Sequence, residues 1–594
     1  MPDSFGQDLR IAQLDTPLGK DKLNIVRFDC TEGVSEKFKI RLTAVSTDQN
    51  LNFDPAIGQN CTITVKSPAG GVERHFDGVL AKAEWTGGEG NEHVYEMVLR
   101  PWLWLASFRR NSLIFHDMTV PEIVSKVLGD YGQVKDTTSR GYPVLEYCVQ
   151  YRETDMDFVC RLMEEYGISY YFQHGQGKHD MILTDEMSTF ESLPGSRTYL
   201  PMTNRTASPE EFFDSWVPQR RFTSGKIKLD DYNFKTSETD LVVTEDVGPP
   251  FDPGSLEVFD HPGRFPDTGV GSKIAKAWSD EQKARDGRYF AEGSVVTCFP
   301  GALVTMVDKD DTGMDGEYLA LRCKHSFTGM AYRSTDAGLR RGYEGEYEFM
   351  RTDKTFAPPR TTPKPIIGGA QTAKVVGNDD IDVDEYGRIL VRFHWDQKED
   401  QSCRVRVAQV WAGKEWGGIF TPRRDMEVLV IFLEGDPDQP LVIGAVYNDK
   451  HMQPYSLPSD KSISGVKSRT TPDSDGYNEF IFDDRAGSQL VRLHAERNLE
   501  SVIENDESRN VKHDRKTEIG NNDTLNVGEV LKITAGTKVE ITVGSSNITM
   551  TTDTITIKSI NVEIKATDFK SDAVTSTHQA SGVMTIQGSM VKIN

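Results

Sequence analysis

Apolar residues recur at helical spacing in two short stretches of the first half of the chain. The first runs from Thr119 to Gly129 and opens with a Thr-x-x-Glu capping box. The second runs from Thr154 to Gly167, a glycine suited to the left-handed position that ends many helices. Both predict amphipathic helices with buried stripes. The following run ISYYF (168–172) predicts a strand.

Two clusters of Pro, Ser, Gly and Asp break the pattern, at 358–365 and 454–475. Between them the chain has short runs rich in Val, Ile and aromatic residues, which predict the strands of a small barrel: 389–395, 405–411, 428–433 and 440–446. Gly387 and the run 435–438 fall between these strands and predict tight turns.

From residue 483 the sequence changes character, because this segment has one aromatic residue, Phe569, and neither Pro nor Cys. Apolar residues alternate with polar ones, at Leu531/Ile533, Val539/Ile541/Val543, Ile555/Ile557 and Val562/Ile564. Glycines recur with a period of eight, at Gly520, Gly528, Gly536 and Gly544. This pattern predicts a repeat of short strands.

Each of these strands has a single apolar face, and the segment offers little else to cover it. Identical chains are the simplest partners, so we expect a homo-oligomeric β-helix or prism, in which strands of several copies wind around a common apolar axis. The segment has 13 Lys plus Arg and 16 Asp plus Glu, so its exterior is nearly neutral. The sequence therefore predicts a stiff, almost uncharged rod.

The composition of the whole chain narrows the class of protein further. Its 594 residues are 37% hydrophobic and carry a net charge of −23, which fits folded domains and disfavours nucleic acid as a partner. Seven cysteines without a Cys-x-x-Cys pair indicate neither a disulfide framework nor a zinc knuckle. The N-terminal stretch lacks the pattern of a signal peptide, so we expect synthesis in the cytoplasm.

Several longer motifs resemble the VgrG family, the spike proteins of bacterial type VI secretion. They are RPWLWLASFRRNSLIFHDMTVPEIV (100–124), QYRETDMDFVCRLMEEYGISYYF (150–172), DYNFK (231–235) and the block 369–448, with DEYGRILVRFHWD and GDPDQPLVIGAVYN. Two positions depart from the family pattern: Arg404 replaces the usual Trp, and 423–425 replace a PRVGQEV-like sequence.

The resemblance implies a mainly β, multidomain homotrimer. We expect a phage-tail-hub-like region of two β-barrel-like domains with inserted helices at 1–365 and an oligonucleotide/oligosaccharide-binding (OB) barrel at 366–453. A linker would follow at 454–482, and an intertwined, triple-stranded β-helical needle at 483–594. A PAAR-repeat protein would bind the needle apex, formed by Met590, Val591, Lys592, Ile593 and Asn594.

Other motifs support no catalytic, cofactor or metal site. Asp380-x-Asp382-x-Asp384 begins like a calcium loop but lacks its Gly and final Glu, and 269–273 lacks the spacing of a phosphate-binding loop and is expected to be a solvated turn. The pair Glu164–Glu165 is expected on a solvated helix face. Three copies of His578 on a trimer axis could hold an ion, but an outward-facing His is the expected case.

The sequence therefore predicts a structural spike that caps the Hcp tube, engages baseplate components, carries separately encoded effector cargo and penetrates a membrane transiently. It would be made in the cytoplasm, assembled on the type VI baseplate and secreted. Two alternatives stay open. A phage-derived tail hub fused to its needle would have the same pattern, and an enzyme acting after delivery would need a further globular domain beyond the needle.

Overall fold

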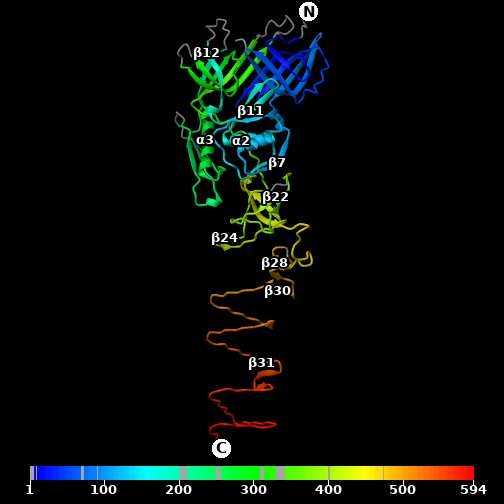
Figure 1. Cartoon of the computed structure of the whole chain (residues 1–594), viewed down its shortest axis with the longest axis vertical. Coiled ribbons are helices and arrows are strands. Elements are labelled where there is room, and N and C mark those ends of the chain that lie inside the picture. Colours follow the sequence, from blue (N-terminus) through cyan, green and yellow to red (C-terminus); the bar gives the residue numbers. More distant parts are fainter. Residues whose placement is uncertain are drawn as a thin grey trace. The chain divides into compact units, whose positions relative to one another are not determined.

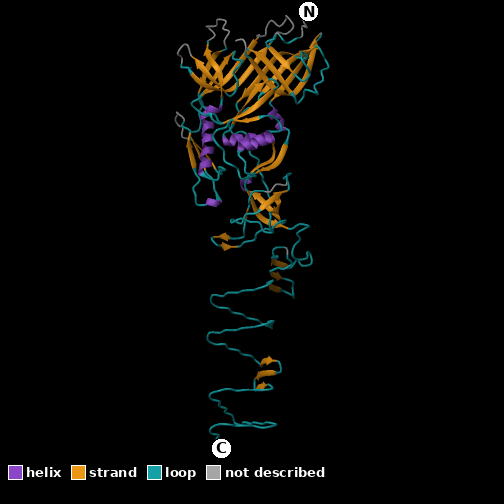
Figure 2. Cartoon of the chain, in the orientation of Figure 1, coloured by secondary structure: helices purple, strands orange, loops and turns teal. Residues whose placement is uncertain are grey.

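The computed structural model describes residues 6–8, 10–67, 72–89, 91–200, 211–248, 256–307, 313–329, 342–398, 402–472 and 474–593. It separates into two units, Met1–Asn498 and Leu499–Asn594 (Figure 1). Strands dominate and helices are few, which confirms the predicted mainly β class (Figure 2).

A 12-stranded sheet in unit 1 takes its strands from residues 12–351, and its strand order divides it into two six-stranded halves. The first half contains β1 (Ala12–Asp15), β2 (Asn24–Gly33), β3 (Lys39–Ser46), β4 (Asn60–Lys66), β5 (Glu73–Glu89) and β6 (Glu92–Arg100). The second contains β12 (Glu191–Tyr199), β13 (Phe212–Gln219), β17 (Arg288–Gly293), β18 (Ala302–Val307), β19 (Gly316–Thr328) and β20 (Gly342–Arg351). Pairing of β19 with β20 closes the second half into a barrel.

The two halves are joined by pairing of β2 with β19, strands that lie almost 300 residues apart. A buried ion pair strengthens the junction, because Arg74 Nη2 lies 2.6 Å from Glu32 Oε1. The Arg74 Nη1 group donates a hydrogen bond of 2.7 Å to the carbonyl of Cys298 in the second half. One guanidinium thus satisfies groups of both halves, as a charge buried this deeply requires.

Helices and small sheets are inserted between the strands of this large sheet. Residues 102–189 form η1 (Trp102–Ser107), β7 (Arg110–Phe115), α1 (Val120–Leu128), β8 (Val134–Asp136), β9 (Cys148–Thr154), α2 (Asp155–Tyr166), β10 (Ser169–Gly175), β11 (Lys178–Thr184) and η2 (Met187–Thr189). Residues 226–285 form β14 (Lys226–Leu229), η4 (Phe234–Thr236), β15 (Val243–Asp246), β16 (Glu257–Asp260) and α3 (Thr268–Arg285).

Helices α1 and α2 confirm the two helices predicted from the sequence. Thr119 and Glu122 form the predicted capping box of α1. The Thr154 hydroxyl accepts the Asp157 amide at 3.0 Å at the start of α2, and Gly167 ends that helix in the left-handed region at φ +69°. The apolar stripes of both helices are buried in one cluster with the first six strands.

Helix α3 corrects the prediction that 269–273 form a solvated turn. Asp267 caps this helix, because its carboxylate accepts the amides of Gly269 and Val270 at 2.8 and 3.0 Å. The two glycines and the lysine of the motif therefore lie in the first helical turns. Two glycines lower the helix propensity of this segment. The N-cap and the packing of the following apolar residues against β14 and β15 together outweigh that cost.

The barrel predicted between the two breaks is present as a five-stranded sheet of order β22-β21-β26-β27-β23. An isolated bridge between Ile389 and Val405 closes it. Its elements are β21 (Gln371–Val376), β22 (Leu390–Phe393), β23 (Arg406–Val407), β26 (Glu427–Phe432), η5 (Leu433–Gly435) and β27 (Pro440–Val446), with a hairpin of β24 (Ala412–Gly413) and β25 (Trp416–Gly417). Gly387 and Gly435 have φ of +68° and +76°, which confirms the predicted turns.

The rest of unit 1 and unit 2 contain two small antiparallel sheets. The first has β28 (Ile463–Lys467), β29 (Glu479–Asp483) and β30 (Leu490–His494), so the expected linker 454–482 contains regular strands. The second lies in unit 2 and has β31 (Lys538–Val543), β32 (Ser546–Thr551) and β33 (Ile555–Lys558). No described helix is long and apolar enough to cross a membrane.

Candidate functional site

The predicted apolar rows are visible in the sheet of unit 2. Ile541 of β31 lies opposite Ile548 of β32, and Ile548 lies opposite Ile557 of β33. These side chains are 55, 39 and 56% exposed in the single chain. A row of isoleucines on a three-stranded sheet leaves apolar area in water that another surface must cover for the sheet to be stable.

Outside this sheet, the predicted alternating strands of unit 2 are not formed in the single chain. Leu531, Ile533, Val562 and Ile564 lie in extended segments without strand partners, and each is more than half exposed. An extended segment becomes a strand only when its amide and carbonyl groups find a neighbouring backbone. The single chain supplies no such neighbour here.

The repeat glycines occupy open positions in unit 2. Gly544 lies in the turn between β31 and β32 with φ +56°, a conformation that glycine adopts without strain. Gly520, Gly528 and Gly536 lie outside strands, and a Cβ atom added at any of them would meet open space. Their part in the repeat therefore stays a prediction.

The expected apex is exposed and extended. Met590, Val591 and Ile593 are 74, 48 and 85% exposed, Lys592 is also exposed, and none of them lies in a strand. Asn594 lies outside the described residues. Three neighbouring apolar side chains on free backbone form a surface that a partner could cover.

The three aspartates of the calcium-like motif are each paired with an arginine. Asp382 Oδ1 lies 2.6 Å from Arg404 Nη2, Asp384 Oδ2 lies 2.6 Å from Arg388 Nε, and Asp380 Oδ2 lies 3.4 Å from Arg423 Nη1. Backbone amides add to this: the amide of Asn378 and the side chain of Arg404 hold the pKa of Asp382 below its ordinary value. Each of these three carboxylates therefore forms an ion pair with an arginine of the same chain.

Two of these arginines are the positions that depart from the family pattern. Arg404 also donates from Nη1 to the Asp382 carbonyl at 3.1 Å, and Arg423 neighbours Asp425, which has φ +71° and pairs with Lys374 at 2.6 Å. Each of these two unusual arginines thus has an aspartate partner in the segment 380–382. The barrel compensates for them with local ion pairs.

His578 is exposed in unit 2, and its Nε2 atom lies 3.1 Å from the Ser576 hydroxyl. Across the part of the chain that the structure describes, no group of three or more His, Cys, Asp and Glu side chains is arranged to hold a metal ion.

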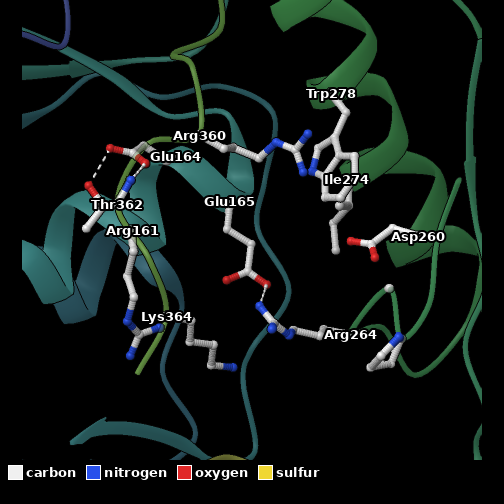
Figure 3. A pocket seen from close by; sticks show the side chains of 12 residues that line it. Arg161, Glu164, Glu165, Asp260, Arg264, Ile274, Trp278, Arg360, Thr362 and Lys364 are labelled. Atoms are coloured by element: carbon white, nitrogen blue, oxygen red, sulfur yellow. Dashed lines mark hydrogen bonds and ion pairs between the residues drawn. The ribbon is translucent and has the colours of Figure 1, made fainter. Parts of the chain in front are cut away.

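A charged cavity of about 170 Å³ lies in unit 1 between α2, α3 and the segment 360–364 (Figure 3). Arg360 packs over the Trp278 ring, with its guanidinium carbon 3.1 Å from the ring centroid. On the α2 side, the Glu164 carboxylate accepts the backbone amides of Thr361 and Thr362, both at 2.7 Å. The side chains of two helices therefore hold the segment 360–364 in place.

Glu164 and Glu165 differ from the solvated pair expected from sequence. Both are partly buried, and Glu165 faces Arg264 at 3.8 Å in the cavity of Figure 3. The cause is tertiary: cationic and amide groups from chain segments 100 to 200 residues away cover this face of α2. Local sequence does not contain that information.

The same cavity adjoins a buried ion cluster that reaches the small barrel. Lys364 Nζ lies 2.8 Å from Asp436 Oδ1 and 2.7 Å from Asp438 Oδ2, and Arg264 Nε lies 3.0 Å from Asp436 Oδ2. Asp438 also accepts the amide of Val149 at 2.7 Å. The turn 435–438, predicted only as a turn, thus fastens the barrel to the helical layer.

Electrostatics within this cluster favour the charged forms. Burial opposes the charge of Lys364, but Asp438 and Asp436 outweigh it and raise its pKa above the ordinary value. Burial likewise opposes the charge of Asp436, yet Lys364 and Arg264 hold its pKa below the ordinary value. Lys364 and Asp436 thus stabilise each other's charged forms, as expected of a structural joint.

Three family descriptions match successive parts of the chain. Residues 31–330 match the phage tail baseplate hub (GPD), 371–447 match the type VI secretion system/phage-baseplate injector OB domain, and 464–571 match the bacteriophage T4 gp5 C-terminal trimerisation domain. Together they define the class: a tail-hub protein that continues through an OB barrel into a trimerising needle.

Sequence similarity to individual proteins identifies the family within this class. The chain is 34% identical to the type VI secretion system spike protein VgrG1b of Pseudomonas aeruginosa over 524 residues, which cover 86% of this chain and 70% of the relative. It is 35% identical to VgrG1c of the same organism, with coverages of 86 and 72%. The chain therefore belongs to the VgrG family of type VI secretion system spike proteins.

Solved structures agree on the fold. The E. coli c3393 protein, described as a type VI secretion component with structural similarity to the T4 tail proteins gp27 and gp5, aligns with a TM-score of 0.54 and 18% identity over 73% of this chain and all of that one. A lidless PdpA–VgrG complex aligns with a TM-score of 0.52 and 10% identity, covering 80% of this chain and 94% of that one.

Proposed function

We propose that this chain is a homotrimeric, cell-puncturing spike at the tip of a type VI secretion apparatus. The observation that carries the proposal is the exposed row of Ile541, Ile548 and Ile557 in unit 2, within the segment that matches a trimerisation domain. Three chains can bury these rows on a common axis and pair their free strand edges. The resulting needle resists bending because its backbone bonds break cooperatively.

The hub region would cap the Hcp tube and contact baseplate components. Support comes from the match of residues 31–330 to a baseplate hub and from the continuous hydrogen-bonded sheet that joins the two six-stranded halves in that region. Sheath contraction would supply the force, so the chain itself needs no catalytic group. Enzymatic activity belongs, in this proposal, to separately encoded effectors that the spike carries.

Expected boundaries follow from the sequence breaks: a hub region to residue 365, a barrel at 366–453, a linker at 454–482 and a needle from 483. The protein would be made in the cytoplasm, assembled on the baseplate and secreted into the extracellular space or a target cell, with transient membrane penetration. In the bacterium that encodes it, deleting the gene should stop release of Hcp into the medium. Continued release in the absence of any other spike gene would contradict the role.

The apex 590–594 would bind a PAAR-repeat protein. Support comes from the exposed apolar side chains of Met590 and Ile593 on unpaired backbone. Deleting 585–594 should abolish capture of the purified PAAR-repeat protein, while light scattering still finds a trimer. Retained capture by the truncated trimer would place the PAAR-repeat protein elsewhere.

A further inference from the structure

A second cavity in unit 1, of about 310 Å³, lies where the start of α3 meets the end of α2 and the segment 140–143. The apolar part of its wall includes Tyr142, Tyr166, Val270 and Ile274. Ile274 also lines the charged cavity of Figure 3, so the two cavities are neighbours on α3. Its volume is at the low end for ligand pockets, which suits one large side chain better than a cofactor.

A hydrogen bond and a ring contact hold the two tyrosines of the cavity wall in place. The Tyr142 hydroxyl donates to Asp185 Oδ2 at 3.0 Å, and the Tyr142 and Tyr166 rings meet edge to face with centroids 6.5 Å apart. The cavity therefore offers a preformed aromatic wall.

Cationic side chains surround the opening. Lys273 and Lys276 are exposed and come from successive turns of the same helix. Lys273 Nζ donates to a neutral acceptor, the carbonyl of Gly141, at 3.1 Å, so this contact leaves its charge uncompensated. Lys276 lies 3.5 Å from Asp280, whose carboxylate already accepts Arg140 at 2.8 Å.

Charge therefore selects the kind of occupant. The chain as a whole carries −23, yet the residues that line this cavity include three cations, Arg140, Lys273 and Lys276, and one anion, Glu186. The neighbouring carboxylates of Asp280 and Asp185 are not part of the lining and are bound by Arg140 and Tyr142. Positive rims around an apolar pocket attract acidic segments and fix their register, while the buried apolar side chain supplies most of the affinity.

We propose that this cavity is a docking site for an acidic segment of a separately folded protein. The segment inserts one aromatic or long aliphatic side chain against Tyr142, Tyr166 and Ile274, and its flanking carboxylates pair with Lys273 and Lys276. The proposal stands apart from the spike function, because it depends only on the cavity and its rim.

The test uses the full-length chain and a fluorescein-labelled peptide, Asp-Glu-Phe-Asp-Glu, with binding followed by fluorescence anisotropy. Replacing the peptide's Phe by Ala should weaken binding about tenfold, the effect of about 1.4 kcal/mol of lost apolar contact. Lys273→Glu combined with Lys276→Glu should weaken it by a further factor of about ten and flatten its dependence on salt. Lys283→Glu, a charge reversal in the last turn of the same helix, is the matched control and should change binding less than about twofold.

A second variant tests the cavity itself. Val270→Trp fills the opening from a partly exposed position and should remove the preference for Phe over Ala while leaving the salt dependence unchanged. Equal thermal midpoints of the variants and the parent would show that each is folded. The proposal fails if the parent does not bind the peptide, as when another copy of the chain fills the cavity. It also fails if the Ala peptide binds as well as the Phe peptide, or if Lys283→Glu weakens binding as much as the double reversal.

Discussion

At the scale of single residues, the structure depends on charges whose partners lie far away in the sequence. Lys364 finds Asp436 and Asp438 more than 70 residues further on, and Arg74 finds Cys298 after 224 residues. Neither pairing can be predicted from the neighbouring residues. The sequence around Asp436, for example, predicts only a turn. Sequence reasoning therefore identified the turn and missed its role, just as it missed the partners of Glu164.

Removing Lys364 should be costly because Asp438 loses its cation and Arg264 alone remains beside the two carboxylates, with Asp436 only 7% exposed. We expect Lys364→Met to lower the free energy of unfolding by about 3–5 kcal/mol. Lys374→Met is the matched control, because its pair with Asp425 has the same kind of geometry but both side chains are about half exposed. It should cost less than about 1 kcal/mol. Urea unfolding followed by circular dichroism measures both, and equal losses would contradict the buried joint.

The pH dependence of that joint has a definite sign. The pKa of Asp436 is lowered from 3.8, so its contribution to stability is present above that pH and is lost as pH falls through the folded value. The pKa of Lys364 is raised from 10.5, so its contribution is present below that pH and is lost as pH rises through the folded value. The stability difference between the parent and Lys364→Met should be constant between pH 5 and 9 and shrink below about pH 4. A difference that grows on acidification would contradict the assignment.

At the scale of elements, α1, α2 and the barrel strands can be predicted from the sequence. Their helix caps and their patterns of apolar and polar positions depend only on residues close together in the chain. Helix α3 was missed. Its second half buries Ser279, Asp280, Glu281 and Gln282, which gives it no clean apolar stripe, and its first turn contains two glycines. Strand pairing was equally out of reach, since β2 meets β19 only through the assembled core.

Gly167 sets the distance between α2 and α3, because a Cβ there would lie 2.7 Å from the Cβ of Ala277. We expect Gly167→Ala to cost about 1–2 kcal/mol from its φ of +69° and about 1–3 kcal/mol more from that contact. Gly177→Ala has a similar φ, +72°, but open space, so it isolates the backbone part. Thermal unfolding of both variants makes the comparison. Equal midpoints would show that the two helices can move apart at no cost.

At the scale of the whole molecule, the account depends on apolar rows that one chain leaves in water. On β31, Val539, Ile541 and Val543 alternate with Glu540 and Thr542. Ile541→Asp places a charge in the row and should prevent trimer formation, whereas Thr542→Asp, one residue along on the other face, should leave it intact. Sedimentation velocity distinguishes the two. If both variants, or neither, lose the trimer, the predicted inner face is wrong.

The most direct test of the central claim is the absolute molar mass of the full-length chain, measured by light scattering coupled to size exclusion. An intertwined needle predicts three times the 66.6 kDa of one chain, about 200 kDa. A protein ending at Asp475 lacks the repeat rows and should lose or weaken that state. A stable full-length monomer would show that the needle segment folds without partners, and it would contradict both the trimeric spike and the function proposed from it.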